Sequence, residues 1–134
     1  MQLNVPVDVA DVMQAALNAQ GVNACAEPLP RDLGSNLPLT LAQPMGSGGR
    51  TDVVVDQFAM RFYTWDEDEP SALESSRAAL AHLLLTEGEQ VDGTQVYRVQ
   101  LTSMPYPAPD PEHQDLARAC FTAYVWARAT TIEI

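Results

Sequence analysis

The most conspicuous potential metal ligands in the chain are four consecutive carboxylates, Asp66 to Glu69, in the segment WDEDEPS. Carboxylate oxygens are the ligands that Ca²⁺ prefers, but an EF-hand loop places its ligands at alternate positions and needs glycine at the sixth. Here Pro70 and Ser71 occupy the fifth and sixth positions. Acidic and hydroxyl side chains also cap free amides at a helix start, and Ser71 with Glu74 matches a capping box. We therefore predict that Asp68 or Ser71 caps a helix, and we expect no metal site.

Asp110, Glu112 and His113 are a second group that could do chemistry, in this case acid–base chemistry. They lie in the segment PYPAPDPEH, in which four of the nine residues are proline. This composition is typical of a stiff, exposed linker. The other histidine, His82, has no cysteine or histidine at a metal-binding spacing, and the serines lie in no motif that activates a nucleophile. We therefore expect a protein that is not an enzyme, with no catalytic residues, metal or cofactor.

A glycine-rich segment, QPMGSGGR at 43–50, is the stretch that could hold a phosphate group. A P-loop needs Lys-Ser or Lys-Thr after its glycines and a helix that presents its amides, whereas here Arg50 leads into a predicted strand. Three glycines in four residues, between two strand candidates, favour a flexible hairpin loop. Exposed loops on a rigid scaffold often contact partners, so Gly46, Gly48, Gly49 and Arg50 are candidate interaction residues.

The two cysteines, Cys25 and Cys120, match no metal-binding or redox spacing. Cys120 lies in the apolar segment RACFTAYVW, where a small hydrophobic residue suits a core. We expect free thiols, although the sequence alone leaves a disulfide between them open.

The composition indicates a single acidic domain. Eighteen acidic residues against seven basic ones, all arginines, give a formal net charge of -11. A chain this acidic repels phosphate backbones, so we expect no specific nucleic-acid binding. No apolar run approaches the ~20 residues that span a bilayer, and the first residues lack the basic start and apolar core of a signal peptide. We expect one domain over 1–134, without a membrane role and made in the cytoplasm.

Hydrophobic periodicity predicts two helices and about four strands. The helices are expected at 7–20, between Pro6 and Gly21, and at 72–85, where leucines share one face. Segment 22–36 is expected to run as an irregular link, and the pattern leaves the structure of 22–50 least determined. The expected strands are 37–42, 51–65, 94–104 and 116–129. The order α-β-β-α-β-β predicts an α+β fold with a small mixed or antiparallel sheet of about four strands and two helices packed on one face.

The last predicted strand is apolar on both faces. Phe121 and Val125 share one face, and Cys120, Tyr124 and Trp126 share the other. Such a strand is either central in a covered sheet or offers one face to a partner, and the sequence leaves both open. The second face is the main sign of oligomerisation in the sequence.

The order of strand, acidic turn, helix, strand, Pro/Asp link and strand resembles the tail terminator, or tail completion, proteins of long-tailed bacteriophages. The resemblance covers 7–128 and is clearest over VVVDQFAMRFYTWDEDEPSALESSRAALAHLL and YRVQLTSMPYPAPDPEHQDLARACFTAYVWAR. It implies a small α+β domain, with a sheet covered on one side by helices, that forms a homo-oligomeric ring, commonly a hexamer. In that family the ring caps the tail tube, ends tail polymerisation and joins the tail to the head.

The resemblance also implies partners and a location. The partners would be further copies of the chain, the tail tube protein and a head-completion or neck protein. The location would be the virion tail, after assembly in the host cytoplasm. Two alternatives stay open: another neck or minor tail protein of the head–tail junction, and a small bacterial α+β domain that binds a ligand or is an enzyme. The expected interaction residues are Gly46, Gly48, Gly49, Arg50, Asp110, Glu112, Tyr124 and Trp126.

Overall fold

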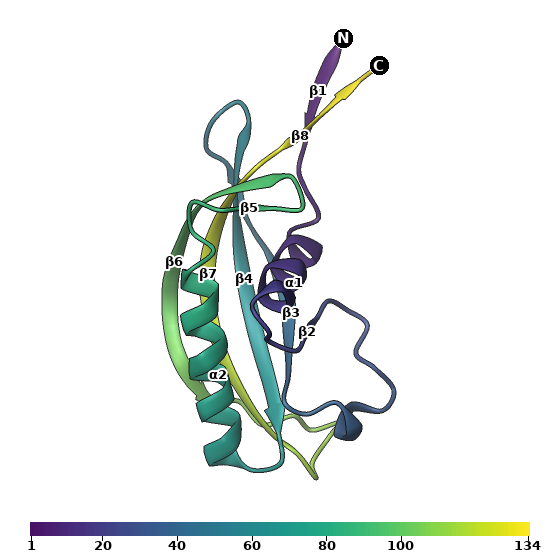
Figure 1. Cartoon of the computed structure of the whole chain (residues 1–134), viewed down its shortest axis with the longest axis vertical. Helices are drawn as coiled ribbons and strands as arrows, with labels where there is room; N and C mark the ends of the chain where they lie inside the picture. The colour runs from purple at the N-terminus through teal and green to yellow at the C-terminus, as the bar shows by residue number, and fades with distance from the viewer.

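The computed structural model describes every residue of the chain, 1–134. Figure 1 shows a long, curved sheet with both helices on one of its faces, and a narrow ribbon, formed by the two ends of the chain, that stands clear of the body. In chain order the elements are β1 (Gln2–Val5), α1 (Val9–Ala19), β2 (Ala24–Cys25), the 3-10 turn η1 (Leu33–Ser35), β3 (Leu39–Arg50), β4 (Val55–Asp66), α2 (Glu69–Leu84), β5 (Gln90–Val91), β6 (Thr94–Pro107), β7 (Ala117–Arg128) and β8 (Thr130–Glu133).

Six strands form the main sheet, in the order β2-β3-β4-β7-β6-β5. The short β2–β3 pair is parallel, and all other neighbours are antiparallel. β4 and β7 pair without a break, from Val55 opposite Arg128 to Asp66 opposite Ala117, and they form the centre of the sheet. β1 and β8 pair with each other in a separate two-stranded sheet, the terminal ribbon.

The expected α+β fold, with about four strands in the order α-β-β-α-β-β, is wrong. The chain has 46% of its residues in strands and 22% in helices, and its two sheets have six and two strands. β2 and β5 have two residues each, which is too few for an alternating pattern to be recognised. β1 and β8 lie at opposite ends of the chain, so neither has a partner nearby in the sequence. The two expected helices are present.

Two segments that the sequence predicts as loops are strands. β3 runs through the glycine-rich segment to Arg50, so the turn to β4 falls at 51–54. β6 runs through the start of the proline-rich segment to Pro107. Proline lacks an amide hydrogen but is tolerated in a strand at the edge of a sheet. Both segments lie at such edges, because their outer neighbours β2 and β5 cover only a few residues of each.

The main core lies between the sheet and the two helices. Phe62 of β4 and Phe121 of β7 lie opposite each other, and their rings stack with centroids 4.9 Å apart. Met13 and Leu17 of α1 and Leu83 of α2 belong to the same cluster and are fully buried. Apolar burial of this kind is the main stabilising contribution to a domain of this size.

Both helices begin at an aspartate cap. Asp68 accepts a hydrogen bond from the backbone N–H of Ser71 at 2.8 Å, which lowers the pKa of Asp68. The prediction that Asp68 or Ser71 caps this helix is confirmed, with Asp68 as the cap. Asp8 caps α1 by accepting from the amide of Asp11. Neither helix is long and apolar enough to cross a membrane.

The turn that follows α2 covers part of the outer edge of β6. The carboxylate of Glu87 accepts a hydrogen bond from the backbone N–H of Val99 at 2.9 Å. The amide of Gly88 donates to the carbonyl of Val96, and the amide of Val96 donates to the carbonyl of Glu89, each at 2.9 Å. These contacts satisfy backbone groups that an edge strand would otherwise leave unpaired.

Gly48 allows β3 to pass the register shift that lies between Pro44 and Gly48. Its φ is +124°, a conformation that side chains rarely adopt, and a Cβ built there would lie 2.1 Å from the carbonyl oxygen of Gln57. A residue with a side chain therefore fits neither the backbone conformation nor the space.

Substitution of Gly48 tests this constraint. We expect Gly48→Ala to lower the free energy of unfolding by about 2 kcal/mol, because backbone strain and the contact with Gln57 both oppose a side chain. Gly49→Ala is the matched control, since a Cβ there meets no atom within 4 Å. It should change stability by less than about 0.5 kcal/mol. Equal denaturation midpoints for the two variants would show that β3 does not need glycine at position 48.

Candidate functional site

The face of β4, β6 and β7 that points away from the helices carries arginine and aromatic side chains. We call it the open face. It includes Arg61 and Tyr63 of β4, Arg98 of β6, and Tyr124 and Trp126 of β7, all of them at least partly exposed. An antiparallel sheet can leave one face in contact with water, so the arrangement is a stable one.

A cleft of about 600 Å³ lies at one end of the open face. This is the end away from the terminal ribbon, where η1 and the link between β6 and β7 come together (Figure 1). Residues 27–29 and 110–113 form its walls, and Arg61, Tyr63 and Arg118 are among the side chains of its floor. A small second core, made of Leu33, Leu39, Leu41 and Trp65, anchors the loop that forms the first wall.

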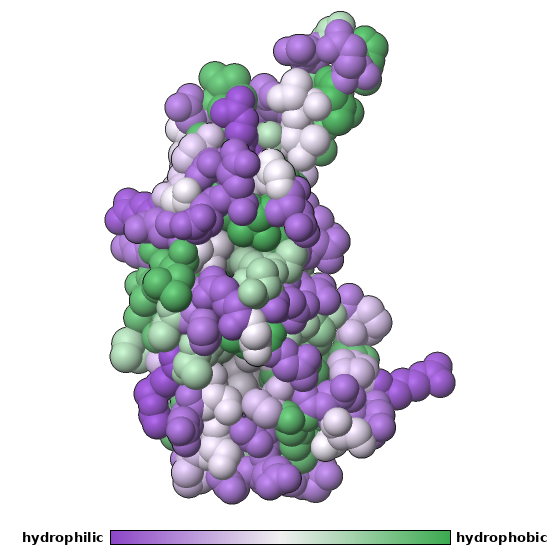
Figure 2. Space-filling view, viewed as in Figure 1, coloured by the Kyte–Doolittle hydropathy of each residue, from purple (hydrophilic) through white to green (hydrophobic).

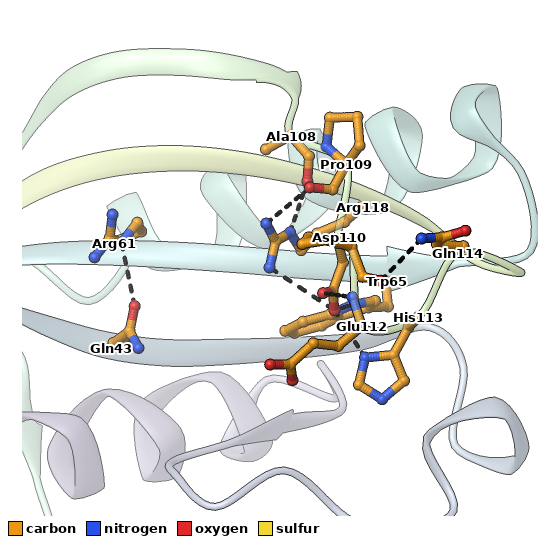
Figure 3. A network of polar contacts seen from close by, with 11 residues as sticks. Gln43, Arg61, Trp65, Ala108, Pro109, Asp110, Glu112, His113, Gln114 and Arg118 are labelled. Atoms are coloured by element: carbon orange, nitrogen blue, oxygen red, sulfur yellow. Dashed lines mark hydrogen bonds and ion pairs between the residues drawn. The ribbon is translucent and has the colours of Figure 1, made fainter.

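Asp110 is the centre of a polar network at this cleft (Figure 3). Its carboxylate accepts hydrogen bonds from Nε1 of Trp65 at 2.9 Å and from the backbone N–H of Glu112 at 3.0 Å. Nδ1 of His113 lies 2.8 Å from the same carboxylate, and a guanidinium nitrogen of Arg118 lies 3.8 Å away. The proline-rich link therefore folds back onto the sheet at Asp110, which is buried, and is not an exposed linker there.

The surroundings of Asp110 favour its charged form. Burial acts to raise the pKa of this carboxyl group, because a low-dielectric environment penalises the charge. The hydrogen bond with His113 and those from the amide of Glu112 and from Trp65 act in the opposite direction. Together with the positive charge of Arg118 they outweigh burial, and the pKa of Asp110 is lower than its usual value.

Arg118 holds the link against the sheet. Its Nε donates a hydrogen bond to the carbonyl of Ala108 at 2.6 Å, and another guanidinium nitrogen donates to the carbonyl of Pro109 at 3.1 Å. The guanidinium also lies 4.0 Å from the ring centroid of Tyr63, which is a cation–π distance. One side chain thus fixes the backbone of the link and the floor of the cleft.

A chain of polar side chains joins the floor to the other wall. Nε of Arg61 donates to Oε1 of Gln43 at 3.1 Å. The side-chain amide of Gln43 donates in turn to a carboxylate oxygen of Glu27. These contacts leave the outer guanidinium nitrogens of Arg61 available to a ligand.

His113 is the imidazole among the titratable side chains of the cleft, which also include Glu27, Asp110 and Glu112. Its Nδ1 pairs with Asp110, which leaves Nε2 free to exchange a proton or to accept a hydrogen bond. The thirteen residues that line the cleft include no serine, threonine or cysteine. Its arginines, His113 and carboxylates give the cleft several groups that can bind a polar ligand, and Tyr63 supplies a phenolic hydroxyl.

The predicted interaction residue Arg50 is engaged within the molecule. Its guanidinium forms two hydrogen bonds with Asp56, at 2.6 and 2.9 Å, and the Asp56 carboxylate is buried. A third hydrogen bond runs to the carbonyl of Asn4 at 3.0 Å. Arg50 therefore ties the terminal ribbon to the β3–β4 hairpin, while the predicted glycines Gly46 and Gly49 lie exposed beside it.

The predicted residues Tyr124 and Trp126 lie together on the open face. Their ring centroids are 6.0 Å apart in an edge-to-face arrangement, and the guanidinium of Arg98 lies 5.1 Å from the ring centroid of Trp126. β7 is central in the sheet, and its second face is partly exposed. That a partner covers this face stays a prediction.

The structure does not gather the predicted residues into one site. Gly49 lies opposite Gln57, and Gln57 lies opposite Trp126, so the glycine segment and the aromatic pair share one end of the sheet. Asp110 and Glu112 lie at the cleft, at the other end. Arg61, Trp65 and Arg118 are site residues that no motif in the sequence indicates. Arg118 could have been found, because alternation places it on the same face of its strand as Tyr124 and Trp126.

Both cysteines are free, as expected. Burial raises the pKa of the Cys25 and Cys120 thiols, which keeps them protonated at neutral pH.

Comparison with known proteins adds no assignment to this geometry. No protein-family model matches the chain, and no curated protein matches it in sequence.

The low pKa of Asp110 predicts a pH-dependent stability. Because the folded pKa is below the unfolded value of about 3.9, the unfolded chain binds a proton first as the pH falls, and stability is lost below about pH 4. We expect the melting temperature of the wild type to fall more steeply between about pH 5 and pH 2 than that of Asp110→Asn. Asp68 also has a lowered pKa, but it is present in both the wild type and Asp110→Asn, so it does not contribute to the difference between their curves.

Asp115→Asn is the control for this measurement, since Asp115 is exposed and its side chain makes no hydrogen bond. This variant should follow the wild-type curve. Parallel curves for Asp110→Asn and the wild type would contradict the role given to the Asp110 network.

The Arg50–Asp56 pair gives a second prediction. Arg50→Gln leaves a buried carboxylate without its partner, so the free energy of unfolding should fall. The loss should be smaller than for a fully buried pair, because the Arg50 side chain is 36% exposed. Arg31→Gln, a change at an exposed arginine, should have an effect near zero. Addition of Asp56→Asn to Arg50→Gln should restore most of the loss in urea denaturation, and no recovery would contradict this account.

Proposed function

We propose that this chain is a structural protein of a bacteriophage or prophage tail. In this proposal it assembles into a homo-oligomeric ring, a hexamer in the simplest case, that caps the tail tube, ends tail polymerisation and joins the tail to the head. The resemblance of the segments from Val53 to Leu84 and from Tyr97 to Arg128 to tail terminators supports it. The position of both helices on one face of the sheet also supports it.

The observation that carries the proposal is the terminal ribbon. In β1 and β8 the apolar side chains share one face, because Leu3 lies opposite Ile132, with Val5 and Ile134 two residues further along. These four side chains are between 38% and 68% exposed. Figure 2 shows hydrophobic residues at the surface of this ribbon, where it stands clear of the body. A two-stranded sheet alone is marginally stable in water, so the ribbon gains stability when another molecule covers its apolar face.

The open face supplies a second surface of a different kind. Tyr124 and Trp126 are partly exposed there, and they belong to the main sheet and not to the ribbon. A subunit that offers several unlike surfaces can form heterologous contacts, which repeat from copy to copy until they close into a ring or continue as a filament. A ring is the product that can end a tube and present a surface to the head.

The tail tube protein and a head-completion or neck protein would be the other partners, and the location would be the virion tail, after assembly in the host cytoplasm. Another neck or minor tail protein of the same junction would use the same surfaces. Infection assays that separate tails of abnormal length from tails that fail to join heads distinguish these roles. Tails of normal length, fully joined to heads, in the absence of this chain would contradict both.

A small ligand-binding or enzymatic domain is the second candidate. The cleft with its His113–Asp110 pair is the observation that favours it. A domain of this class would be a monomer or dimer in solution whose melting temperature rises with a ligand. A ring-forming protein would be a larger closed oligomer.

Mass in solution is the decisive experiment. Light scattering behind size-exclusion chromatography, with native mass spectrometry, should give one defined multiple of the 14.6 kDa chain at high protein concentration. Negative-stain images should then show closed rings. A monomer that persists to millimolar concentration, also in the presence of tail tubes, would refute the proposal.

The ribbon gives the corresponding prediction. Leu3→Asn combined with Ile132→Asn makes the apolar face polar, and the apparent association constant should fall by about tenfold or more, because hydrophobic burial is lost. Gln2→Asn combined with Glu133→Gln alters the opposite face of the same strands and should leave association unchanged. Analytical ultracentrifugation measures both variants. Equal association of the two would show that the apolar face of the ribbon stays in water.

A further inference from the structure

Positive charge is concentrated on the open face of a strongly acidic chain. Four of the seven arginines lie there, namely Arg61, Arg98, Arg118 and Arg128. β6 and β7 contain no aspartate or glutamate at all, although the chain has 18 acidic residues. The two acidic residues of β4 lie on the helix-covered side. Glu27, Asp110 and Glu112 line the cleft at one end of this face, beside Arg61 and Arg118. The basic part of the open face is therefore the other end, which carries Arg98 and Arg128, on a protein of net charge -11.

Most of this positive charge has no partner within the molecule. Only Arg118 among the four is close to a carboxylate, that of Asp110. Arg98 lies over the ring of Trp126, and Arg128 donates a hydrogen bond to the hydroxyl of Tyr97 at 3.3 Å. These contacts orient the two exposed guanidinium groups without neutralising them. Oriented, unpaired arginines beside aromatic rings are typical of the central residues of protein interfaces.

The opposite side of the molecule has the complementary character. Glu67, just before α2, and Glu69 and Glu74 in its first turns are exposed, and none of them forms an ion pair. Further along α2 the outer surface carries the exposed Arg77 and apolar residues, with exposed alanines at 78 and 81 and Leu85 two-thirds exposed. Positions 74, 78, 81 and 85 share one face of the helix. This surface, which we call the outer face of α2, has three glutamates against one arginine, together with small apolar side chains.

We propose that the open face of one copy docks on the outer face of α2 in the next copy. This deepens the proposed ring and rests on the proposal that the chain assembles with itself. Arg98 and Arg128 would meet Glu67 and Glu74, and the rings of the open face would cover the alanines and leucines of the helix. Because the two faces lie on opposite sides of one molecule, each copy uses both, and the contact runs head to tail.

A second copy is the occupant that the charges favour. A polyanion such as single-stranded nucleic acid also suits arginines interleaved with aromatic rings. The net charge of -11 repels it at long range, however, whereas the outer face of α2 brings carboxylates in a fixed, local arrangement. The test therefore includes an oligothymidylate as a competing ligand.

Paired charge reversals test the contact. One variant carries Arg98→Glu and Arg128→Glu, and the other carries Glu67→Arg and Glu74→Arg. Alone, each variant opposes like charges at every contact, so its apparent association constant should fall by about tenfold or more. An equimolar mixture restores opposite charges at every contact, because each copy then meets a neighbour of the other kind. The mixture should regain assemblies of wild-type size with the two variants alternating.

Controls separate this contact from general repulsion. Arg31→Glu makes half of the change in net charge of the double variant at a residue outside β4, β6 and β7, and it should assemble like the wild type. Far-ultraviolet circular dichroism and melting temperatures check that the variants are folded. If a reversal variant unfolds, Arg98→Gln combined with Arg128→Gln tests the same contact by removing the two charges without reversing them. Association should then be weaker than in the wild type and less sensitive to salt.

The possible outcomes are distinct. If the wild type forms rings but the reversal variants assemble equally well, or if the mixture does not recover, the docking contact is wrong and the proposed function stands. A monomeric wild type refutes both. If the wild type binds oligothymidylate through Arg98 and Arg128, and substitution of these arginines leaves self-association unchanged, the open face binds nucleic acid and the docking contact is refuted.

Discussion

The unbroken ladder between β4 and β7 is the constraint on which the rest of the structure depends. It runs over the full length of β4, and the stacked rings of Phe62 and Phe121 lie within it. Side chains alternate across a strand, so a shift of one residue would move Phe121 to the open face and Tyr124 into the core. The apolar core beneath the helices and the arginine-bearing open face are therefore two results of a single register.

The aromatic rings of the open face prepare its arginines for contact. A cation–π contact at an exposed site contributes about 0.5 to 1 kcal/mol. Arg98 on Trp126 and Arg118 on Tyr63 both have this geometry, at 5.1 and 4.0 Å. A guanidinium held flat against a ring has already lost part of its rotamer freedom, so less entropy remains to be lost when a partner binds. The open face is rigid because its charges rest on the sheet itself.

Local patterns in the sequence predicted the features that depend on interactions between residues close together in the chain. The Asp68 cap, the two helices and the alternation of β7 follow from spacing within one segment. The pairing of β1 with β8 does not, since it joins residues more than a hundred positions apart. The proline-rich link is typical of an exposed segment by composition alone, but Trp65, from the distant strand β4, and Arg118, at the start of β7, bind Asp110 and hold the link on the sheet. The glycine-rich segment looked flexible, although Gly48 allows a strand to continue there.

Glu87 has a consequence for how this sheet can grow. Its carboxylate occupies the Val99 amide that an incoming strand would need, and the turn beside it satisfies the backbone of Val96. Further along the same edge, Pro105 and Pro107 offer no amide hydrogen. Only the few residues between Val99 and Pro105 could pair with a strand of another molecule, and this stretch is too short to template one. Edge-on extension of the kind that leads to amyloid is thereby blocked along β6.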